Sequence, residues 1–261
     1  MEKSFVARNL RKSISYVNIR KNKDLHTETK RLIIAKKAAN LVDDHTIFEN
    51  SLNSLVLKGK QAFTVNDTSK NLVLNLLSRN IKTSYNILVK SREEITATLI
   101  AFLKESSPYH IHRFDIKSFY ESFDRSKIIS KLKKDGIISK KNIDLLFLLF
   151  KELEDNDIVG LPRGLGLSAT LSELMMKDFD KSKKNMEGVF YYARFVDDMI
   201  FITDNKLTKP HIIEVIENSV PDKLEIHTRG DKIFFGRLTK AKNQKDYTQC
   251  KFSYLGSVVS G

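Results

Sequence analysis

The chain has 261 residues, 41% of them hydrophobic, so it is long enough to bury a core as one large domain or two small ones. Lysine and arginine outnumber aspartate and glutamate by 45 to 32, and the net charge of +13 favours a polyanion such as nucleic acid as partner. The single cysteine, Cys250, excludes an internal disulfide and fits a cytoplasmic protein. No apolar run has the length of a membrane span, so no membrane partner is expected.

The first 78 residues are predicted to be a basic, mainly helical extension. Residues 1–40 hold eleven Lys or Arg against three Asp or Glu, a pattern typical of a solvated face and suited to contact a nucleic-acid backbone. A helix is expected over 28–41. Residues 41–78 are predicted to form one or two short helices with a polar break at 66–69, where Thr68 or Ser69 is the expected N-cap.

Residues 79–108 are predicted to contain a short strand and a helix. The strand covers 84–89. The helix begins at Ser91, which forms a capping box with Glu94, and it runs to Lys104 before Pro108 stops it. Basic residues cluster in the same region, namely Arg79, Lys82, Lys90 and Arg92.

Strands and helices alternate from residue 109 onward. The expected helices cover 126–134, 141–152, 209–219, and a stretch from Ser168 or Thr170 to Phe179. Residues 224–227 and 233–235 are predicted to pair as antiparallel strands, and 251–259 to form a final strand. Asp124 is predicted to cap a surface helix, and Asp178 and Asp180 to occupy exposed helix positions.

Two adjacent acids, Asp197 and Asp198, lie in the middle of an apolar stretch that covers 191–202. The stretch has the pattern of two strands joined by a tight turn, a position that usually favours Gly or Asn. Neighbouring carboxylates repel each other and need a counter-charge. A hard divalent cation such as Mg²⁺ is the natural one, because it binds carboxylate oxygens together with substrate phosphates.

A third acid, Asp115, lies 82 residues upstream of Asp197 at the end of another expected buried strand, residues 111–114. Two strands that each carry a carboxylate to one place form the minimal cage for a two-metal phosphoryl-transfer site. The histidines show no convincing metal spacing.

Three motifs in this order resemble those of the reverse transcriptases. Phe195-Val196-Asp197-Asp198 resembles their catalytic turn, the stretch from Asp115 to Phe123 (DIKSFYESF) resembles their first catalytic motif, and Gly160 to Glu173 between them resembles their nucleotide-binding motif. Most of that family has Gln where this chain has Arg163, and Pro where it has Ala169. With these departures the sequence is more similar to the bacterial antiphage branch, the abortive-infection and defence-associated enzymes.

The resemblance covers about residues 80–259 and implies an α/β (α+β) fold of fingers and palm. A small antiparallel palm sheet backed by helices is expected over 109–261, fingers over 79–108 and part of 1–78, and a helical N-terminal extension. No thumb is evident in the sequence. Three alternatives stay open: a non-coding RNA or a partner protein supplies its role, the sequence is a fragment, or the duplex is gripped in another way. An oligomer is a further expected form of the protein.

The resemblance also implies the site. Asp115 and Asp197 would hold two Mg²⁺ ions, for which Mn²⁺ can substitute, with help from the backbone carbonyl of Ile116. Asp198 would be a further ligand or would support the others. The implied primer grip consists of Tyr254, Leu255 and Gly256. The implied nucleotide-binding residues are Tyr120, as the steric gate against a 2′-hydroxyl, Arg163, Gly164, Lys90, Arg92 and Lys232.

The expected function is RNA-directed DNA synthesis: dNTPs are added to a primer 3′ end on an RNA template, giving a DNA product, in bacterial antiviral defence. Template-independent or protein-primed DNA synthesis and RNA synthesis by the same fold stay open. So does a catalytically silent scaffold that binds RNA or protein. Arg194 is expected to pair with an acid or to touch the primer backbone.

Overall fold

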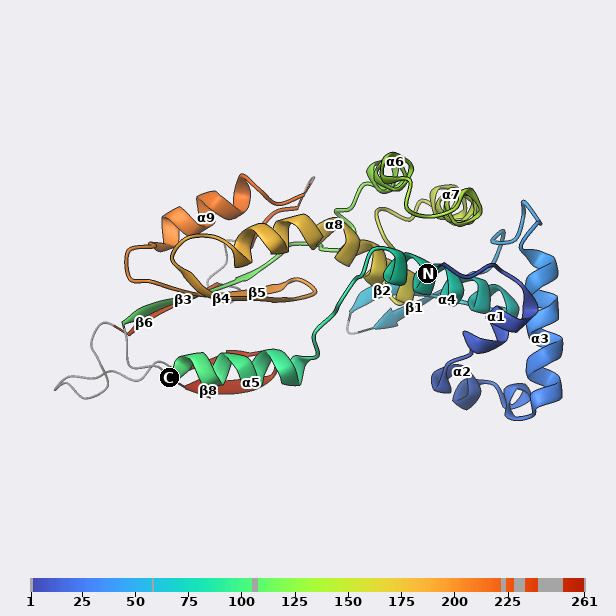
Figure 1. Cartoon of the computed structure of the whole chain (residues 1–261), viewed down its shortest axis with the longest axis horizontal. Coiled ribbons are helices and arrows are strands. Elements are labelled where there is room, and N and C mark those ends of the chain that lie inside the picture. Colours follow the sequence, from blue (N-terminus) through green and yellow to red (C-terminus); the bar gives the residue numbers. More distant parts are fainter. Residues whose placement is uncertain are drawn as a thin grey trace. The chain divides into compact units, whose positions relative to one another are not determined.

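A computed structural model describes residues 2–57, 59–104, 108–221, 224–227, 233–238 and 251–260, and the chain divides into two compact units. Unit 1 consists of Met1–Ile87 with Phe123–Leu174, and unit 2 of Leu88–Ser122 with Met175–Gly261. Helix α8 (Gly166–Lys184) contributes to both. The fold class is the predicted one, a mixture of helices and small antiparallel sheets (Figure 1).

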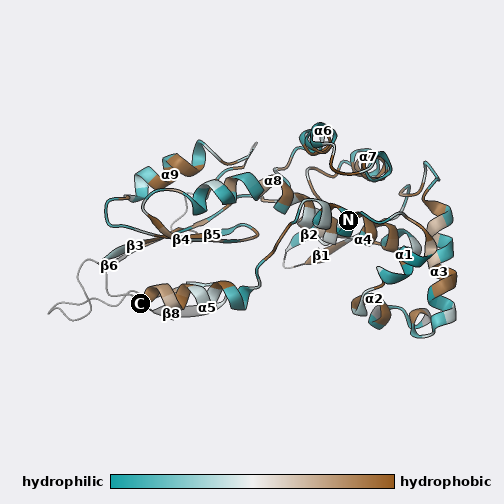
Figure 2. Cartoon of the chain, in the orientation of Figure 1, coloured by the Kyte–Doolittle hydropathy of each residue, from teal (hydrophilic) through white to brown (hydrophobic). Residues whose placement is uncertain are grey.

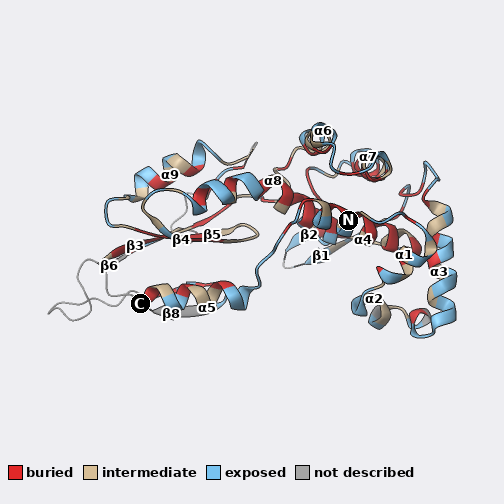
Figure 3. Ribbon diagram, in the orientation of Figure 1, coloured by how far each residue is buried: buried red, intermediate tan, exposed pale blue. Residues whose placement is uncertain are grey.

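Unit 1 is mainly helical. Its core forms around α4, whose residues Leu72, Leu76, Leu77 and Ile81 are fully buried at helical spacing. Helix α3 has only two buried residues and is largely exposed (Figure 3). The complete helices of the unit are α1 (Ala7–Lys12), α2 (Tyr16–Lys21), the 3₁₀ helix η1 (Lys23–His26), α3 (Glu28–Leu41), α4 (Thr68–Ser84), α6 (Arg125–Asp135) and α7 (Lys140–Asp155).

The predicted helices over 41–66 are wrong. This segment contains the antiparallel hairpin of β1 (Leu52–Leu57) and β2 (Lys60–Val65), and Gly59, with φ +74°, lies in the turn between them. The N-cap of α4 is Asp67, not Thr68 or Ser69. Its carboxylate accepts hydrogen bonds from the backbone N–H groups of Ser69 and Lys70, so an acid supplies the cap.

The predicted strand over 84–89 is also wrong. Helix α4 continues to Ser84 because Ile81 extends its buried face by a further turn. Tyr85 then caps the helix, and Asn86 leaves it with φ +49°. The helix expected after this segment is confirmed as α5 (Arg92–Leu103), and Ser91 and Glu94 form the predicted capping box.

Unit 2 is organised around a four-stranded antiparallel sheet with strand order β4-β5-β3-β6. The strands are β3 (Tyr109–Asp115), β4 (Val189–Phe195), β5 (Asp198–Thr203) and β6 (Phe234–Leu238). A separate hairpin consists of β7 (Lys251–Tyr254) and β8 (Ser257–Ser260), and α9 (Lys209–Glu217) follows β5. Helices cover both faces of the sheet, because successive side chains of a strand point to opposite sides.

We call one side of the sheet the front face, defined on β3 by Ile111, Arg113 and Asp115. Helix α5 and the β7–β8 hairpin pack against this face. Ile95, Leu99 and Leu103 of α5 and Phe252 and Tyr254 of β7 join the buried cluster formed by the sheet residues Tyr109, Ile111, Tyr191, Ala193, Ile200 and Ile202.

The other side is the back face, defined on β3 by His112 and Phe114. It is covered by α8 and α9. The ribbon of α9 alternates between hydrophobic and hydrophilic stretches, as expected of a half-buried helix (Figure 2). The ring of Phe179 on α8 lies 6.4 Å from that of Tyr192 on β4. Nζ of the buried Lys183 lies 3.4 Å from the carbonyl oxygen of Val215, which joins α8 to α9.

Two strand predictions at the end of the chain are corrected. Residues 224–227 and 233–235 do not pair with each other: Ile226 bridges to Ile116, and β6 pairs with β3. The single strand expected over 251–259 is the β7–β8 hairpin instead. Leu255 and Gly256 turn the chain there, with φ +50° and +85°.

Among the described helices, none combines the length and the apolar character that a bilayer span requires.

Candidate active site

The three predicted acids lie together at one end of the unit 2 sheet. Asp115 is the last residue of β3 and Asp198 the first of β5, and the two are direct partners in the antiparallel register. Their Cα atoms are therefore about 4.5–5.5 Å apart. Asp197 lies in the two-residue turn between β4 and β5, and its carbonyl oxygen accepts a hydrogen bond of 3.0 Å from the N–H of Ile116. The backbone thus ties the turn to the residue that follows Asp115.

The acidic turn has an unusual backbone. Val196, the first of its two residues, has φ +59°, where a type II′ turn normally has glycine and where a β-branched residue is strained. Nη1 of Arg194 donates a hydrogen bond of 2.8 Å to the carbonyl oxygen of Val196. Strain of this kind persists only where the surroundings hold it, and it concentrates at functional sites.

Arg194 is paired with an acid, one of the two expected alternatives. Its Nε and Nη2 donate to Oδ1 and Oδ2 of Asp180 at 3.0 and 2.7 Å, and its side chain is 2% exposed. The prediction that Asp180 occupies an exposed position is therefore wrong. Asp180 also accepts a hydrogen bond of 2.7 Å from Tyr192, and burial, followed by this carboxylate, raises the pKa of the Tyr192 phenol well above its usual value. By contrast, Asp124 caps α6 as predicted.

Asp115 is 6% exposed and lies against the segment 225–227. The N–H of His227 donates to its carbonyl oxygen at 2.8 Å, and the His227 Nε2 atom lies 3.3 Å from its Oδ1. One residue further on, the N–H of Lys117 donates to the carbonyl oxygen of Glu225 at 2.8 Å. These contacts fix the direction of the Asp115 carboxylate at the end of the strand.

Asp198 is held by Arg113. Nη2 and Nε of this arginine donate to Oδ1 of Asp198 at 2.9 and 3.3 Å, and its Nη1 donates to the carbonyl oxygen of Ser253 on β7 at 3.1 Å. Tyr254, the predicted primer-grip aromatic, is fully buried beside this pair, and burial followed by the Asp198 carboxylate raises its pKa. Leu255 and Gly256 form the turn that follows. The structure thus brings the predicted primer grip and the acids together.

The oxygen atoms at this sheet end are donors of the kind that hard cations prefer. Within the part of the chain that the structure describes, no three His, Cys, Asp or Glu side chains are grouped as a complete metal site. Mg²⁺ in nucleotide-processing enzymes is commonly held by one or two carboxylates plus substrate phosphates. Asp115, Asp197 and the carbonyl group of Ile116 lie at the same sheet end, and their oxygen atoms are the hard donors that this ion prefers.

The structure brings some of the predicted nucleotide-binding residues to this sheet end. The guanidinium of Arg92 lies 4.7 Å from the ring centroid of Phe195, which ends β4 beside the acidic turn. Tyr120 is half-buried, and its ring lies 5.3 Å from that of Phe119. Lys90 is exposed. Lys232 lies outside the described residues.

Arg163 and Gly164 belong to unit 1, where the glycine has a packing role. The carbonyl oxygen of Arg163 accepts a hydrogen bond of 2.7 Å from Phe63 on β2. Gly164 has φ +94°, and a Cβ there would lie 2.5 Å from the carbonyl oxygen of Phe63. Only glycine fits this close approach. The role of both residues in nucleotide binding stays a prediction.

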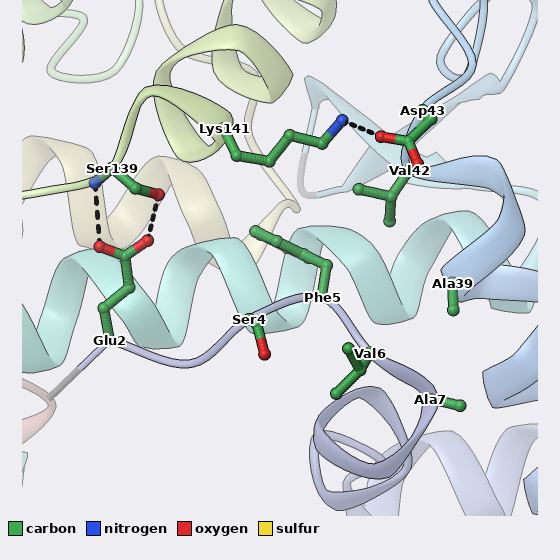
Figure 4. Close-up of a pocket in the computed structure, with 10 residues that line it drawn as sticks. All are labelled: Glu2, Ser4, Phe5, Val6, Ala7, Ala39, Val42, Asp43, Ser139 and Lys141. Carbon is green, nitrogen blue, oxygen red and sulfur yellow. Dashed lines mark hydrogen bonds and ion pairs between the residues drawn. The ribbon is translucent and has the colours of Figure 1, made fainter.

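Two of the cavities in the described part of unit 1 bear on the site predictions. One of about 360 Å³ adjoins the loop from Gly164 to Leu167 and is lined by uncharged residues, among them Asn71 and Asn75. The other, of about 710 Å³, lies between the N-terminal segment, α3 and α7 (Figure 4). Hydrogen bonds that Ser139 donates to the Glu2 carboxylate and an ion pair between Lys141 and Asp43 border it, and no predicted site residue lines it.

Sequence reasoning missed three residues of the site. The signal for Arg113 is its position two residues before Asp115, because residues two apart on a strand share a face. Asp180 also had one: it lies four residues after Met176 and three before Lys183, both buried, so helical spacing directs it inward. His227 had no local signal, because a single bridge to a distant strand brings it to Asp115.

The chain is similar in fold to telomerase, a reverse transcriptase. It superposes on apo telomerase from Candida tropicalis with a TM-score of 0.50 and 14% identity, over 80% of this chain and 46% of that one. It superposes on Candida tropicalis telomerase in complex with a TWJ fragment of telomeric RNA with a TM-score of 0.51 and 14% identity, over 87% of this chain and 50% of the other. The chain spans about half the length of these telomerase chains.

No protein-family model matches the sequence, and no curated protein matches it. The structural likeness, at this identity, establishes the reverse-transcriptase-like fold and no more.

Proposed function

We propose that this chain is an RNA-directed DNA polymerase that adds dNTPs to a primer 3′ end. The observation that carries the proposal is the register of the sheet, which pairs Asp115 with Asp198 and bonds Asp197 to Ile116 in a reverse-transcriptase-like fold. The net charge of +13 supports a nucleic-acid partner, and the similar telomerase solved with a telomeric RNA fragment supports RNA in particular.

Each residue at the sheet end has a role in this proposal. Asp115 and Asp197 hold Mg²⁺ together with the Ile116 carbonyl. Arg113 holds Asp198, and His227 orients Asp115. Bound magnesium supplies charge stabilisation and lowers the pKa of the attacking hydroxyl. Tyr120 acts as the steric gate, and Arg92, beside the acidic turn, offers a cation to the triphosphate.

The test is the incorporation of labelled dNTPs or NTPs on a primed RNA template with Mg²⁺. Wild type should incorporate dNTPs, and Asp197→Asn should lose on the order of 10³-fold in rate, because an amide cannot balance a dication. Lys131→Gln is the control, since Lys131 forms an ion pair with Asp135 in the other unit. Product without a template would move the chain to template-independent synthesis. Incorporation of NTPs alone would make it an RNA polymerase, and no product at all would favour the scaffold.

We place this activity in the cytoplasm of bacteria, as part of antiviral defence. The support is the sequence pattern around Arg163 and Ala169, which resembles the antiphage enzymes. The test is the plating efficiency of phages on cells that express wild type or Asp197→Asn at equal levels. Protection that depends on Asp197 supports the role, and equal protection by both variants contradicts a role for DNA synthesis in it.

A further inference from the structure

Arg113 contacts two separate parts of the front face at once. Its Nη2 and Nε atoms donate to Asp198, the first residue after the acidic turn, at 2.9 and 3.3 Å. Its Nη1 atom donates to the carbonyl oxygen of Ser253 on β7 at 3.1 Å, and its guanidinium lies 5.9 Å from the ring centroid of Tyr254. One planar side chain therefore connects the acidic turn to the hairpin that resembles a primer grip.

The contacts also place a positive charge directly beside Asp198. Both hydrogen bonds from Arg113 go to the same oxygen, Oδ1, and charge-assisted bonds of this kind are about twice as strong as neutral ones. A carboxylate whose charge is balanced by a neighbouring guanidinium is a weak ligand for a dication. Asp198 therefore has its own counter-ion in Arg113, at the place where it adjoins Asp197 in sequence and pairs with Asp115 in the sheet.

We propose that Arg113 is a positioning residue that couples the acidic turn to the β7–β8 hairpin and keeps Asp198 as its own counter-ion, not as a metal ligand. This deepens the proposed polymerase function and rests on it. A displacement of β7 by a bound primer is then transmitted through Arg113 to the start of β5, where the acids lie. Asp115 and Asp197 are the two carboxylates that hold metal.

The first test is a double-mutant cycle on the rate of dNTP incorporation. If Arg113 acts through Asp198, Arg113→Gln and Asp198→Asn should each lower the rate about 10–100-fold, and the double variant should be no slower than the slower single one. Effects that multiply in the double variant would mean that the two residues act independently, which would overturn the coupling.

The second test separates the two contacts of Arg113. Lysine keeps a positive charge beside Asp198 but lacks the fork that reaches Ser253 as well. Arg113→Lys should therefore leave kcat nearly unchanged and raise the KM for primer about tenfold, the loss expected for one hydrogen bond to a charged group. A fall in kcat with an unchanged KM would overturn the link to β7.

The third test needs no catalysis. Titration of the full chain with Mn²⁺ alone, followed by electron paramagnetic resonance, should show weakened binding for Asp115→Asn and unchanged binding for Asp198→Asn. Equal weakening by both would make Asp198 a ligand and overturn the assignment. Hydrogen exchange over residues 252–255 should increase in Arg113→Gln, and unchanged exchange there would overturn the coupling.

The matched control for these measurements is Lys131→Gln. The ion pair of Lys131 with Asp135 has side-chain exposures of 30% and 23%, close to the 21% and 22% of Arg113 and Asp198, but it lies on α6 of the other unit. If the chain incorporates no nucleotide at all, the polymerase proposal fails, and the Mn²⁺ and exchange results still decide whether Arg113 couples the two elements.

Discussion

The two faces of the unit 2 sheet each hold an arginine–aspartate pair beside the acidic turn. The two arginines differ in burial, whereas the aspartates, Asp180 and Asp198, are 20% and 22% exposed. On the back face, Arg194 is 2% exposed, binds both oxygens of Asp180 and also holds the carbonyl of Val196. On the front face, Arg113 and Asp198 are 21% and 22% exposed, and the arginine reaches a second element. The comparison separates a pair that fixes the shape of the turn from one that a ligand can reach.

The energetics of the two pairs should differ accordingly. Breaking a buried ion pair leaves an uncompensated charge in a poorly solvated place, whereas a partly exposed pair is screened by water and contributes little to stability. Stability measurements should therefore identify the back-face pair, and activity measurements the front-face pair. The first and the last of the four predictions below test this division directly, and all four are given in order of decreasing effect.

The largest effect is expected on the back face. Arg194→Gln takes the buried guanidinium away from both oxygens of Asp180, which is 20% exposed, and removes a donor from the strained Val196 carbonyl, so it should destabilise the protein by about 2–4 kcal/mol. Thermal or urea unfolding of the purified chain measures it. A loss below 1 kcal/mol would show that the pair is solvated and would remove the contrast between the faces.

The second prediction concerns Tyr120, five residues after Asp115. Tyr120→Ala removes the ring that would exclude a 2′-hydroxyl, and discrimination against ribonucleotides should fall about 10²-fold, the usual value for rejection of one added hydroxyl. The measurement is the ratio of kcat/KM for dNTP and NTP. A variant that still excludes NTPs would show that Tyr120 is a packing residue.

The third prediction uses pH to probe the back face. Burial, followed by the neighbouring His110, lowers the pKa of the fully buried His112 from 6.5 to about 4. The folded state thus favours the neutral ring. The contribution of His112 to the stability of the folded protein is therefore fully present above pH 6.5 and is lost as the pH falls toward 4. Between pH 7 and pH 5 this group should remove about 2 kcal/mol of stability.

His112→Phe cannot titrate, so it should reduce that pH dependence, as read from unfolding midpoints at pH 7 and pH 5. His211→Gln, an exposed position on α9, is the control. An identical loss of stability in wild type and His112→Phe would place the titrating group elsewhere.

The smallest effect on stability is expected on the front face. Arg113→Gln should change the free energy of unfolding by less than about 1 kcal/mol, because the pair it breaks is partly exposed. The same unfolding experiment as for Arg194→Gln measures it. Equal destabilisation by the two variants would mean that both arginines are structural.

The sequence predicted the acidic centre because its signals are local. Asp115 and Asp197 each adjoin short apolar runs, and such runs predict strands whatever surrounds them. The start of α5 was equally clear, since Ser91 and Glu94 form a self-contained capping box. These signals need no knowledge of the rest of the chain.

The missed features depend on distant or weak patterns. Strand β1 has no fully buried residue, so its hairpin with β2 shows no alternation of apolar and polar residues. The pairing of β6 with β3 joins residues more than a hundred positions apart, whereas local pattern favours a hairpin with the nearest strand. His227 reaches Asp115 by the same non-local route.

The alternation along β3 has a consequence for how this protein can evolve. One face of the strand carries Tyr109, Ile111, Arg113 and Asp115, and the other carries His112 and Phe114. The same alternation of every second residue therefore places both the core side chains and the acid. A single-residue insertion or deletion within the strand would exchange the faces. Insertions and deletions are therefore expected to be tolerated in surface connections such as 204–208, but not within β3, where they would move Asp115 to the other face.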